Sequence, residues 1–305
     1  MSGVTDAPFR RLAARLGAGL VVSEMTASDD LVQGRPISRL RCEAAGIGPH
    51  VVQLAGCETR WMREGARVAE EAGADIIDIN MGCPARHVTG GQSGSALMRD
   101  LDHAVSLIEA TVEAANVPVT LKMRLGWDDR SKNAPELARR AEAAGVQMIT
   151  VHGRTRCQFY KGEADWAAVR VPVTINGDII DPASARVALE VSGADAVMVG
   201  RGACGAPWMP ARIDAALASG CDPGPPPLWT QAAIARRHVE DMLAEYGARH
   251  GLNIARKHIG WYLASSGRPA DTVRAWRKRL CTAQDPGEAL SGLASFYQEA
   301  AEMAA

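Results

Sequence analysis

The sequence lacks several features that would mark a secreted, membrane or metal-binding protein. Its seven cysteines are odd in number and never spaced as Cys-x-x-Cys, which predicts neither a disulfide framework nor a metal site and favours a reducing, cytoplasmic setting. No apolar run is long enough to cross a bilayer, and no basic segment followed by an apolar one begins the chain, so no membrane partner is expected. The net charge is only −1, so any nucleic-acid partner needs a local basic patch.

Aromatic residues are also scarce, at 5%, whereas apolar residues make up 47% and charged residues 23% of the 305 positions. This composition supports a large core and excludes a disordered chain. The shortage of aromatic residues favours close packing of helices on a sheet over a β-sandwich. The length fits one large domain with a small one, or two average domains, and we expect a monomer.

Short apolar runs alternate with segments of helical periodicity, which predicts an α/β fold with a parallel sheet. The predicted strands are 20–23, 50–55, 75–80, 117–124, 147–152, 171–176 and 194–200. The clearest helices are 60–72, 103–115, 134–144 and 182–191, and three of them are followed by a glycine that can stop a helix, at Gly73, Gly145 and Gly193. Polar residues follow the strands, as in a (β/α)8 TIM barrel. A doubly wound sheet is the alternative, weakened by the lack of Gly-x-Gly-x-x-Gly after an early strand.

Only seven of the eight barrel strands are found. The chain begins with Met1-Ser2-Gly3-Val4-Thr5-Asp6, which has the character of a loop that follows a first strand. Either the barrel is open, with two strand edges to be covered, or the sequence starts at an internal methionine of a longer product, which is the explanation that we favour.

A proline-rich segment, residues 221–228, divides the predicted domains. Three consecutive prolines, Pro225-Pro226-Pro227, cannot continue a helix and indicate a linker. We therefore expect a TIM-barrel domain over residues 1–220 and an all-α helical bundle over residues 229–305.

Several strand ends carry reactive or charged side chains. Cys83 follows the run 75–80 in Asn80-Met81-Gly82-Cys83-Pro84, where it is either a buried small apolar residue or a catalytic acid or nucleophile. Lys122 and Arg124 lie two apart and hence on one face of their strand, which is costly unless an anion binds there. His152 ends another run.

Two tripeptides at later strand ends, Asn176-Gly177-Asp178 and Gly200-Arg201-Gly202, suit a phosphate group, because glycines let backbone N–H groups approach an oxyanion. Their positions at consecutive strand ends favour a phosphorylated cofactor over chance.

A local basic patch lies in the C-terminal region. Residues 249–279 contain eight Lys or Arg against a single acid, Asp271, with Trp261, Tyr262 and Trp276 among them. This pattern is typical either of a solvated helical face or of a surface that docks a phosphate backbone, and the concentration of charge favours docking.

Taken in order, these motifs resemble the tRNA-dihydrouridine synthases. The similarity runs from the N-terminus to about Pro210 and is carried by eight segments, which are residues 4–10, 22–25, 53–56, 78–84, 121–127, 151–156, 176–178 and 198–201. A ninth, Arg256-Lys257-His258-Ile259-Gly260-Trp261-Tyr262, is similar to the helical domain of the bacterial B-type branch. The family has a further strand and a proline before the residues that match Met1-Ser2.

The resemblance implies an FMN-dependent enzyme that uses NADPH to reduce the C5–C6 bond of one tRNA D-loop uridine. Hydride would reach C6 from the flavin, and Cys83 would protonate C5. The implied FMN contacts are Met1, Ser2, Gln53, Lys122, His152, Asn176, Gly177, Asp178, Gly200 and Arg201. The expected substrate contacts are Asn80 at the uracil and, along the tRNA, Arg154, Arg256, Lys257, Arg274, Arg277 and Lys278.

Two other functions remain open from the residues alone. One is a flavin barrel acting on a small molecule, such as a dihydroorotate or dihydropyrimidine dehydrogenase, although such a substrate has no use for a basic helical domain. The other is a non-catalytic RNA-binding regulatory protein in which the lack of the first strand has disabled the flavin site.

Overall fold

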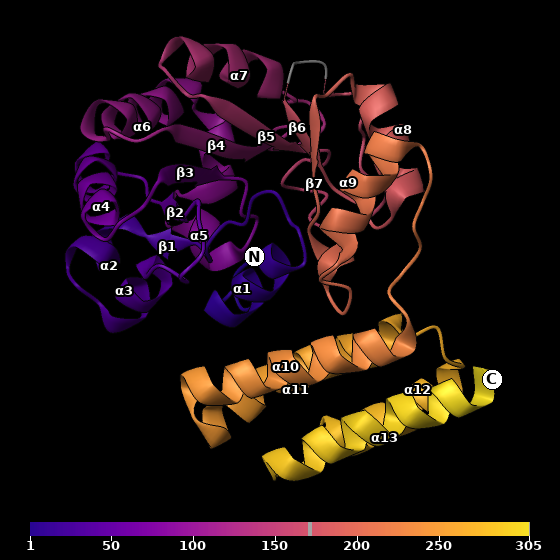
Figure 1. The fold of residues 1–305 in the computed structure, drawn as a ribbon. Helices are drawn as coiled ribbons and strands as arrows, with labels where there is room; N and C mark the ends of the chain where they lie inside the picture. The colour runs from indigo at the N-terminus through magenta and orange to yellow at the C-terminus, as the bar shows by residue number, and fades with distance from the viewer. Residues whose placement is uncertain (170–172, 305) are drawn as a thin grey trace. The chain divides into compact units, whose positions relative to one another are not determined.

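Seven parallel strands follow one another across a single sheet in the order of the chain (Figure 1). The computed structural model describes residues 1–169 and 173–304. The strands are β1 (Thr26–Ala27), β2 (Val51–Ala55), β3 (Ile76–Met81), β4 (Val119–Arg124), β5 (Met148–His152), β6 (Thr174–Asn176) and β7 (Ala196–Met198). This sequential parallel order, with a helix between most strands, is that of a (β/α) barrel and confirms the predicted fold class. Among the described residues no strand pairing joins β7 to β1, so the sheet holds seven strands and keeps two edges.

The chain divides into two compact units. The first comprises residues 1–14 and 19–200, and the second comprises residues 15–18 and 201–305. Residues 201–220, which the sequence analysis grouped with the barrel, are thus grouped with the C-terminal helices. No helix among the described residues combines the length and apolar character needed to span a membrane.

Helices alternate with the strands of the first unit along the chain, and the longer ones lie outside the sheet (Figure 1). The helices are α1 (Ala7–Arg15), α2 (Ser28–Val32), α3 (Pro36–Cys42), α4 (Thr59–Glu71), α5 (Arg86–Gly90), η1 (Gly94–Arg99, a 3₁₀ helix), α6 (Leu101–Ala114), α7 (Ala134–Ala143) and α8 (Pro182–Ser192). The buried face of α4 consists of Met62 and the small residues Gly65, Ala66 and Ala69, whereas that of α6 combines Ala104 and Ala110 with larger residues such as Leu107 and Ile108. Small side chains let a helix approach the sheet closely, which explains how a chain so poor in aromatic residues fills its core.

The core of the sheet lies in β2 to β5. Every residue of β2 is buried, and Leu54, Ile79, Leu121 and Val151 have almost no exposed surface. Strands buried on both faces are expected to be continuously apolar, so the polar residues within them require another reason. By contrast, β7 at the edge is only partly covered.

Most predicted elements are confirmed within two residues, but the first strand is wrong. Val22 makes only an isolated bridge to Val51, and the strand that pairs with β2 is Thr26–Ala27. The apolar run 20–23 misled the prediction because β1 is too short to show a pattern. Residues 171 and 172 of the predicted strand 171–176 lie outside the described part of the chain. The three helix-stopping glycines all have positive φ, between 67° and 101°.

The second unit is helical. It contains η2 (Arg201–Ala203, a 3₁₀ helix), α9 (Met209–Ser219), α10 (Leu228–Tyr246), α11 (Ala248–Ser265), α12 (Ala270–Leu280) and α13 (Pro286–Ala304). No helix covers residues 221–227 of the predicted linker 221–228, and α10 begins at its last residue, Leu228. The core of this unit joins Val239 of α10, Ile259 of α11, Leu280 of α12 and Phe296 of α13, none of which has measurable exposed surface.

Candidate active site

Polar side chains from five neighbouring strands meet at the carboxyl ends of the sheet. They are Gln53 (β2), Asn80 (β3), Lys122 (β4), His152 (β5) and Asn176 (β6). The parallel register places Asn80 opposite Lys122 and His152 opposite Asn176. Five of the residues predicted from separate sequence motifs therefore lie on adjoining strands at one edge of the sheet.

A buried carboxylate organises the half of this edge formed by β2 and β3, and the sequence analysis missed it. Asp78 accepts hydrogen bonds from Gln53 Nε2 at 2.6 Å and from Thr120 Oγ1 at 2.6 Å. Gln53 Oε1 in turn accepts from Asn80 Nδ2 at 2.8 Å. Burial raises the pKa of the Asp78 carboxyl, and the two hydrogen bonds oppose that rise. The signal was present in the sequence, since Asp78 and Asn80 are polar and two apart in an otherwise apolar strand.

The same chain of hydrogen bonds reaches the backbone of Cys83. Asn80 Oδ1 accepts from Gly82 N at 3.1 Å and from Cys83 N at 2.9 Å, while Cys83 O accepts from Ser95 Oγ at 2.8 Å and Ser95 N at 3.1 Å. Cys83 is half-buried. Its thiol thus sits on a backbone held from both sides, as a positioned catalytic group requires.

Gly94 makes this tight loop possible. Its φ is +61°, and a Cβ built there would lie 2.8 Å from Cys83 O and 3.2 Å from Cys83 Cβ. An L side chain would be strained at that φ and would also press on the loop that carries Cys83. Glycine is therefore needed at position 94, because the backbone there lies too close to Cys83 for a side chain.

Lys122 is a partly buried cation whose hydrogen-bond partner is a neutral amide. Its Nζ donates to Asn176 Oδ1 at 3.0 Å, and Asn176 Nδ2 donates to Met198 O at 2.7 Å. Burial lowers the pKa of Lys122 to about 8. No carboxylate of the described residues forms an ion pair with Lys122, so an anionic group placed here would be stabilised by it.

Two glycines end the strands beside Lys122, and their surroundings differ. Gly177 has a φ of +108°, and a Cβ there would lie 3.0 Å from Ala164 Cβ and 3.3 Å from His152 Cε1. A Cβ on Gly200 would make only ordinary van der Waals contacts, with Met1 Sδ at 3.7 Å and Asn176 Nδ2 at 3.9 Å. Gly177 therefore serves close packing within the protein, whereas the partly buried lysine beside these strand ends would suit a flavin with its phosphate.

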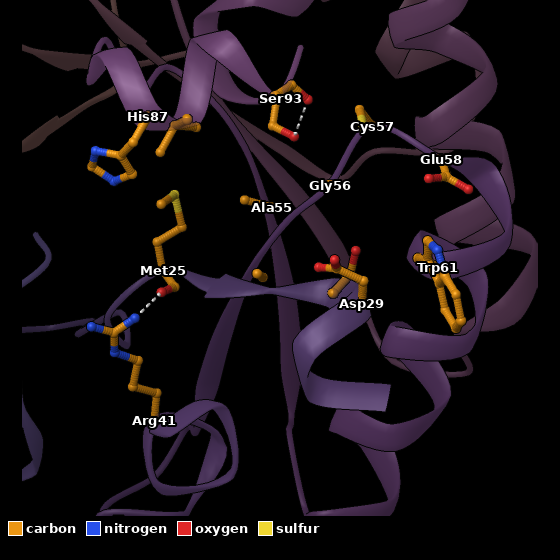
Figure 2. A pocket seen from close by; sticks show the side chains of 14 residues that line it. Met25, Asp29, Arg41, Ala55, Gly56, Cys57, Glu58, Trp61, His87 and Ser93 are labelled. Carbon is orange, nitrogen blue, oxygen red and sulfur yellow. Dashed lines mark hydrogen bonds between the residues drawn. The ribbon is translucent and has the colours of Figure 1, made fainter. Parts of the chain in front are cut away.

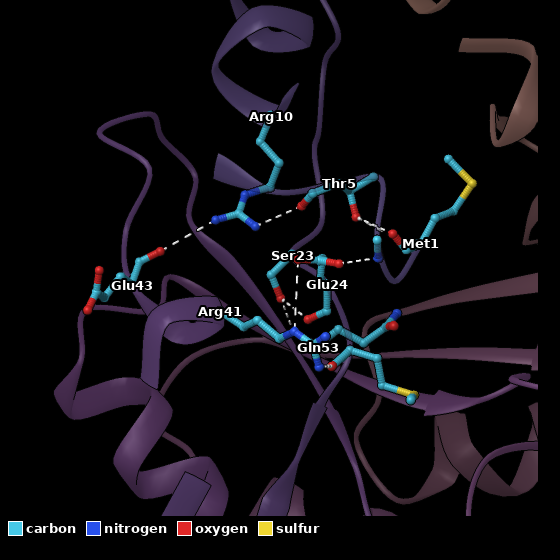
Figure 3. Close-up of polar contacts among 10 residues, drawn as sticks. Met1, Thr5, Arg10, Ser23, Glu24, Arg41, Glu43 and Gln53 are labelled. Carbon is cyan, nitrogen blue, oxygen red and sulfur yellow. Dashed lines mark hydrogen bonds and ion pairs between the residues drawn. The ribbon is translucent and has the colours of Figure 1, made fainter. Parts of the chain in front are cut away.

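The N-terminal loop is fastened to the same end of the sheet (Figure 3). Met1 N donates to Thr5 Oγ1 at 2.9 Å, and the carboxylate of Glu24 accepts a short hydrogen bond from Gly3 N. Ser23 Oγ links Glu24 O, at 2.8 Å, to Gln53 N, at 2.9 Å. Met1 and Ser2, expected at the cofactor, therefore lie in a loop that is tied through Glu24 and Ser23 to β2.

Two arginines near the site have internal partners, which changes our expectation for one of them. Arg154 was expected to contact the substrate, but its guanidinium is almost wholly buried in an ion pair with Asp178 and also donates to Gly162 O at 2.6 Å. Arg124 likewise donates to the carbonyls of Gly82, Thr155 and Phe159 at 2.8 to 2.9 Å. The cost of burying these cations is met by protein acceptors, and we do not retain Arg154 as a substrate contact.

In the second unit, the predicted cationic residues differ in availability. Arg274, Arg277 and Lys278 are exposed on α12, and Lys257 is half-buried on α11. Arg256 instead donates to Ala283 O at 2.7 Å and to Asn253 Oδ1 at 3.0 Å. Arg201, placed by motif at the phosphate, is exposed and begins η2 in this unit. The most accessible cluster of positive charge is therefore on α12.

Within residues 1–169 and 173–304, no group of three or more His, Cys, Asp or Glu side chains could hold a metal ion.

Comparison with known proteins gives one consistent result. The family profile described as Dihydrouridine synthase (Dus) matches residues 1–302. A probable tRNA-dihydrouridine synthase of Rhodobacter capsulatus is 53% identical, over 98% of this chain and 93% of its own length. One from Rhizobium leguminosarum is 54% identical, over 96% and 92%. The tRNA-dihydrouridine synthase B of Pseudomonas putida is 43% identical, over 98% and 90%.

A solved structure supports the fold alone. The 6-hydroxypseudooxynicotine amine oxidase of Pseudomonas geniculata superimposes with a TM-score of 0.53 at 15% identity, covering 73% of this chain and 47% of that one.

Proposed function

Because this chain belongs to the dihydrouridine synthase family, we propose that it reduces a uridine of tRNA to dihydrouridine, with FMN as its cofactor and NADPH as the source of electrons. The observation that carries the proposal is the juxtaposition of Asn80 and Lys122 in register, with Asn80 holding the backbone of Cys83. A thiol, which we propose as the proton donor, and a partly buried lysine thus lie at one edge of the sheet.

The residues at this edge would hold the flavin. Lys122 suits the electron-rich edge of its ring system, and Gln53 and Asn176 offer hydrogen-bonding amides. The backbone N–H groups of Gly177 and Gly200 at the strand ends would suit its phosphate. Once bound, reduced FMN supplies a hydride for C6 of the uracil. A fixed positive charge acts strongly in a site that excludes water, so Lys122 is placed to stabilise negative charge there.

Cys83 would act as the general acid. Addition of hydride at C6 leaves negative charge across C5 and O4, and the Cys83 thiol gives its proton to C5. Asn80 fixes the Cys83 backbone through Oδ1, and its position beside Cys83 suits a contact with the uracil. Gln53 bonds directly to Asp78, and Asn80 bonds to Gln53. This buried carboxyl would therefore position both the residue proposed to contact the flavin and the residue proposed to contact the uracil.

The helical unit would bind the body of the tRNA. Exposed Arg274, Arg277 and Lys278 provide positive charge that can pair with phosphates. A target uridine must leave its base stack to reach a buried site, at a cost of a few kcal/mol. Binding energy from this remote contact offsets that cost.

The test uses the purified full chain, NADPH and a tRNA transcript that carries no modified bases. We expect a yellow protein with flavin absorbance, and a mass gain of two hydrogens at one D-loop uridine. A protein that stays colourless after incubation with FMN, and leaves every uridine unreduced, would refute the proposal.

A further inference from the structure

A cavity of about 360 Å³ lies over the carboxyl ends of β1 and β2, next to the loop that carries Cys83 (Figure 2). Its floor includes Ala27 of β1 and Ala55 of β2, and His87, Val88 and Ser93 line it from the segment after Cys83. Its size falls within the range of small-molecule sites, roughly 300–1,000 Å³. Nothing in the proposed reaction so far uses it.

The cavity adjoins the catalytic loop through Val88. A Cβ on Gly94 would contact both Val88 Cγ1, at 2.9 Å, and Cys83 Cβ, at 3.2 Å. Val88 therefore packs on one side against the Cys83 loop and borders the cavity on the other. A ligand in the cavity would be a near neighbour of the base presented to Cys83.

The cavity walls have opposite chemical character. Asp29, Glu58 and the Trp61 ring lie on one side, and Arg41 and His87 lie on the other (Figure 2). Arg41 also donates to Met25 O at 3.1 Å and pairs with Glu24 at 3.9 Å, so a ligand would share its guanidinium with them. In the part of the chain that the structure describes, neither Asp29 nor Glu58 has a side-chain hydrogen bond or ion pair. Arg60 stacks on Trp61, with its guanidinium carbon 4.4 Å from the ring centroid, and so holds the ring in place.

This polarity matches a nucleotide. The carboxylates can accept N–H donors from a base edge, an aromatic ring offers a stacking surface, and cationic groups suit a phosphate. Guanine presents two adjacent donor groups, N1–H and N2–H₂, to a carboxylate. In uracil, the single N3–H is flanked by two carbonyl oxygens that a carboxylate repels.

A further polar group supports a polar occupant. Ser28 also lines the cavity, is fully buried, and its hydroxyl has no hydrogen-bond partner among the described residues. Buried polar groups in native proteins are normally satisfied, so a polar ligand would complete the environment of Ser28.

We infer that this cavity is a second nucleotide subsite, which takes a guanine base flanking the uridine that is reduced. The inference rests on the proposed function and adds to it a determinant of sequence context. Asp29 and Glu58 would read the base edge, Trp61 would stack on it, and Arg41 and His87 would face its phosphate.

The main test is a double-mutant cycle between protein and tRNA. The variant Asp29→Asn/Glu58→Gln keeps side-chain size and removes both charges, and Glu71→Gln, on the exposed surface of α4 away from the cavity, is the matched control. Each guanine within two nucleotides of the reduced uridine is replaced by adenine, one at a time, and kcat/KM is measured for dihydrouridine formation. Flavin content and melting temperature are compared among all three proteins.

We expect one guanine replacement to lower kcat/KM at least ~10-fold in the wild type and in Glu71→Gln, but less than ~2-fold in the double variant. Equal effects in all three proteins would overturn the inference while leaving the proposed reaction intact.

A direct binding measurement tests the subsite even if the protein reduces no uridine. Equilibrium dialysis of the full-length, FMN-loaded protein against GMP, AMP, CMP and UMP should show GMP bound most tightly, with a preference over UMP of ~10-fold that the double variant loses. Equal binding of the four nucleotides, or the same preference in the double variant, would contradict the subsite. A failure of dihydrouridine formation alone refutes only the proposed function.

Discussion

The helical unit should lose stability sharply in mild acid because two histidines are buried within it. His238 of α10 and His258 of α11 have ring centroids 4.7 Å apart, and His238 Nδ1 lies 2.9 Å from the Tyr262 hydroxyl. Burial lowers the pKa of His238 to about 3 and that of His258 to about 2. The charged groups that face the pair are Asp241, which favours protonation of His238, and Arg15 and Lys257, which oppose it.

The size of the effect follows from proton linkage. In the unfolded chain each histidine titrates near pH 6.5, whereas in the folded chain both stay neutral to well below pH 5. The unfolded state therefore binds more protons as the pH falls below 6.5, and the folded state loses stability. At pH 5.0 each histidine costs about 2 kcal/mol relative to pH 7.5, and the pair costs about 4 kcal/mol.

Hydrogen exchange of peptides from α10 and α11 reports the free energy of unfolding of the helical unit. It is measured by mass spectrometry at pH 5.0 and pH 7.5 and corrected for the intrinsic exchange rates. His258→Gln should halve its dependence on pH, and His250→Gln, at an exposed position of the same helix, should leave it unchanged. Equal protection of α10 and α11 at the two pH values would refute the reasoning.

Three further predictions concern the candidate active site and the proposed tRNA-binding surface on α12. Cys83→Ala should keep its flavin and oxidise NADPH, but form dihydrouridine at least ~100-fold more slowly because general acid catalysis is removed; normal product formation, measured by mass spectrometry, excludes the acid role. Gly94→Ala places a Cβ 2.8 Å from Cys83 O and should lower kcat with the flavin spectrum retained. Gly73→Ala, where nothing lies within 4 Å of the Cβ, controls for the strain of a positive φ. Equal kcat values in the two variants would count against a tight loop at Cys83. Arg277→Glu/Lys278→Glu should weaken tRNA binding. The slope of log binding constant against log salt concentration should become shallower by roughly 0.9 for each phosphate that the variant no longer neutralises. Arg139→Glu, exposed on α7, is the control, and an unchanged slope in filter-binding assays would contradict the docking surface.

The local pattern of the chain already determined most of the secondary structure. Helices such as α7 and α8 were bounded by helix-stopping glycines and by prolines at their first turns, which act within a few residues. The strands were apolar because both of their faces are covered. Lys122 and Cys83 could be singled out because they lie at or just after the ends of apolar strands, whereas Asn80 was identified only through the family resemblance.

Long-range packing decided the rest. Nothing near Arg154 in the sequence shows that Asp178 neutralises it, and nothing near β1 shows that two residues suffice to pair with β2. The same holds for Asp78, whose partners come from β2 and β4, and for the cavity beside Cys83, which is lined by residues from 25 to 93. Local sequence sets which conformation each segment prefers and which chemical groups it carries. Only the packing of distant segments sets which of those groups are buried together, and burial with a particular partner decides whether a charge stabilises the fold or is left to act on a ligand.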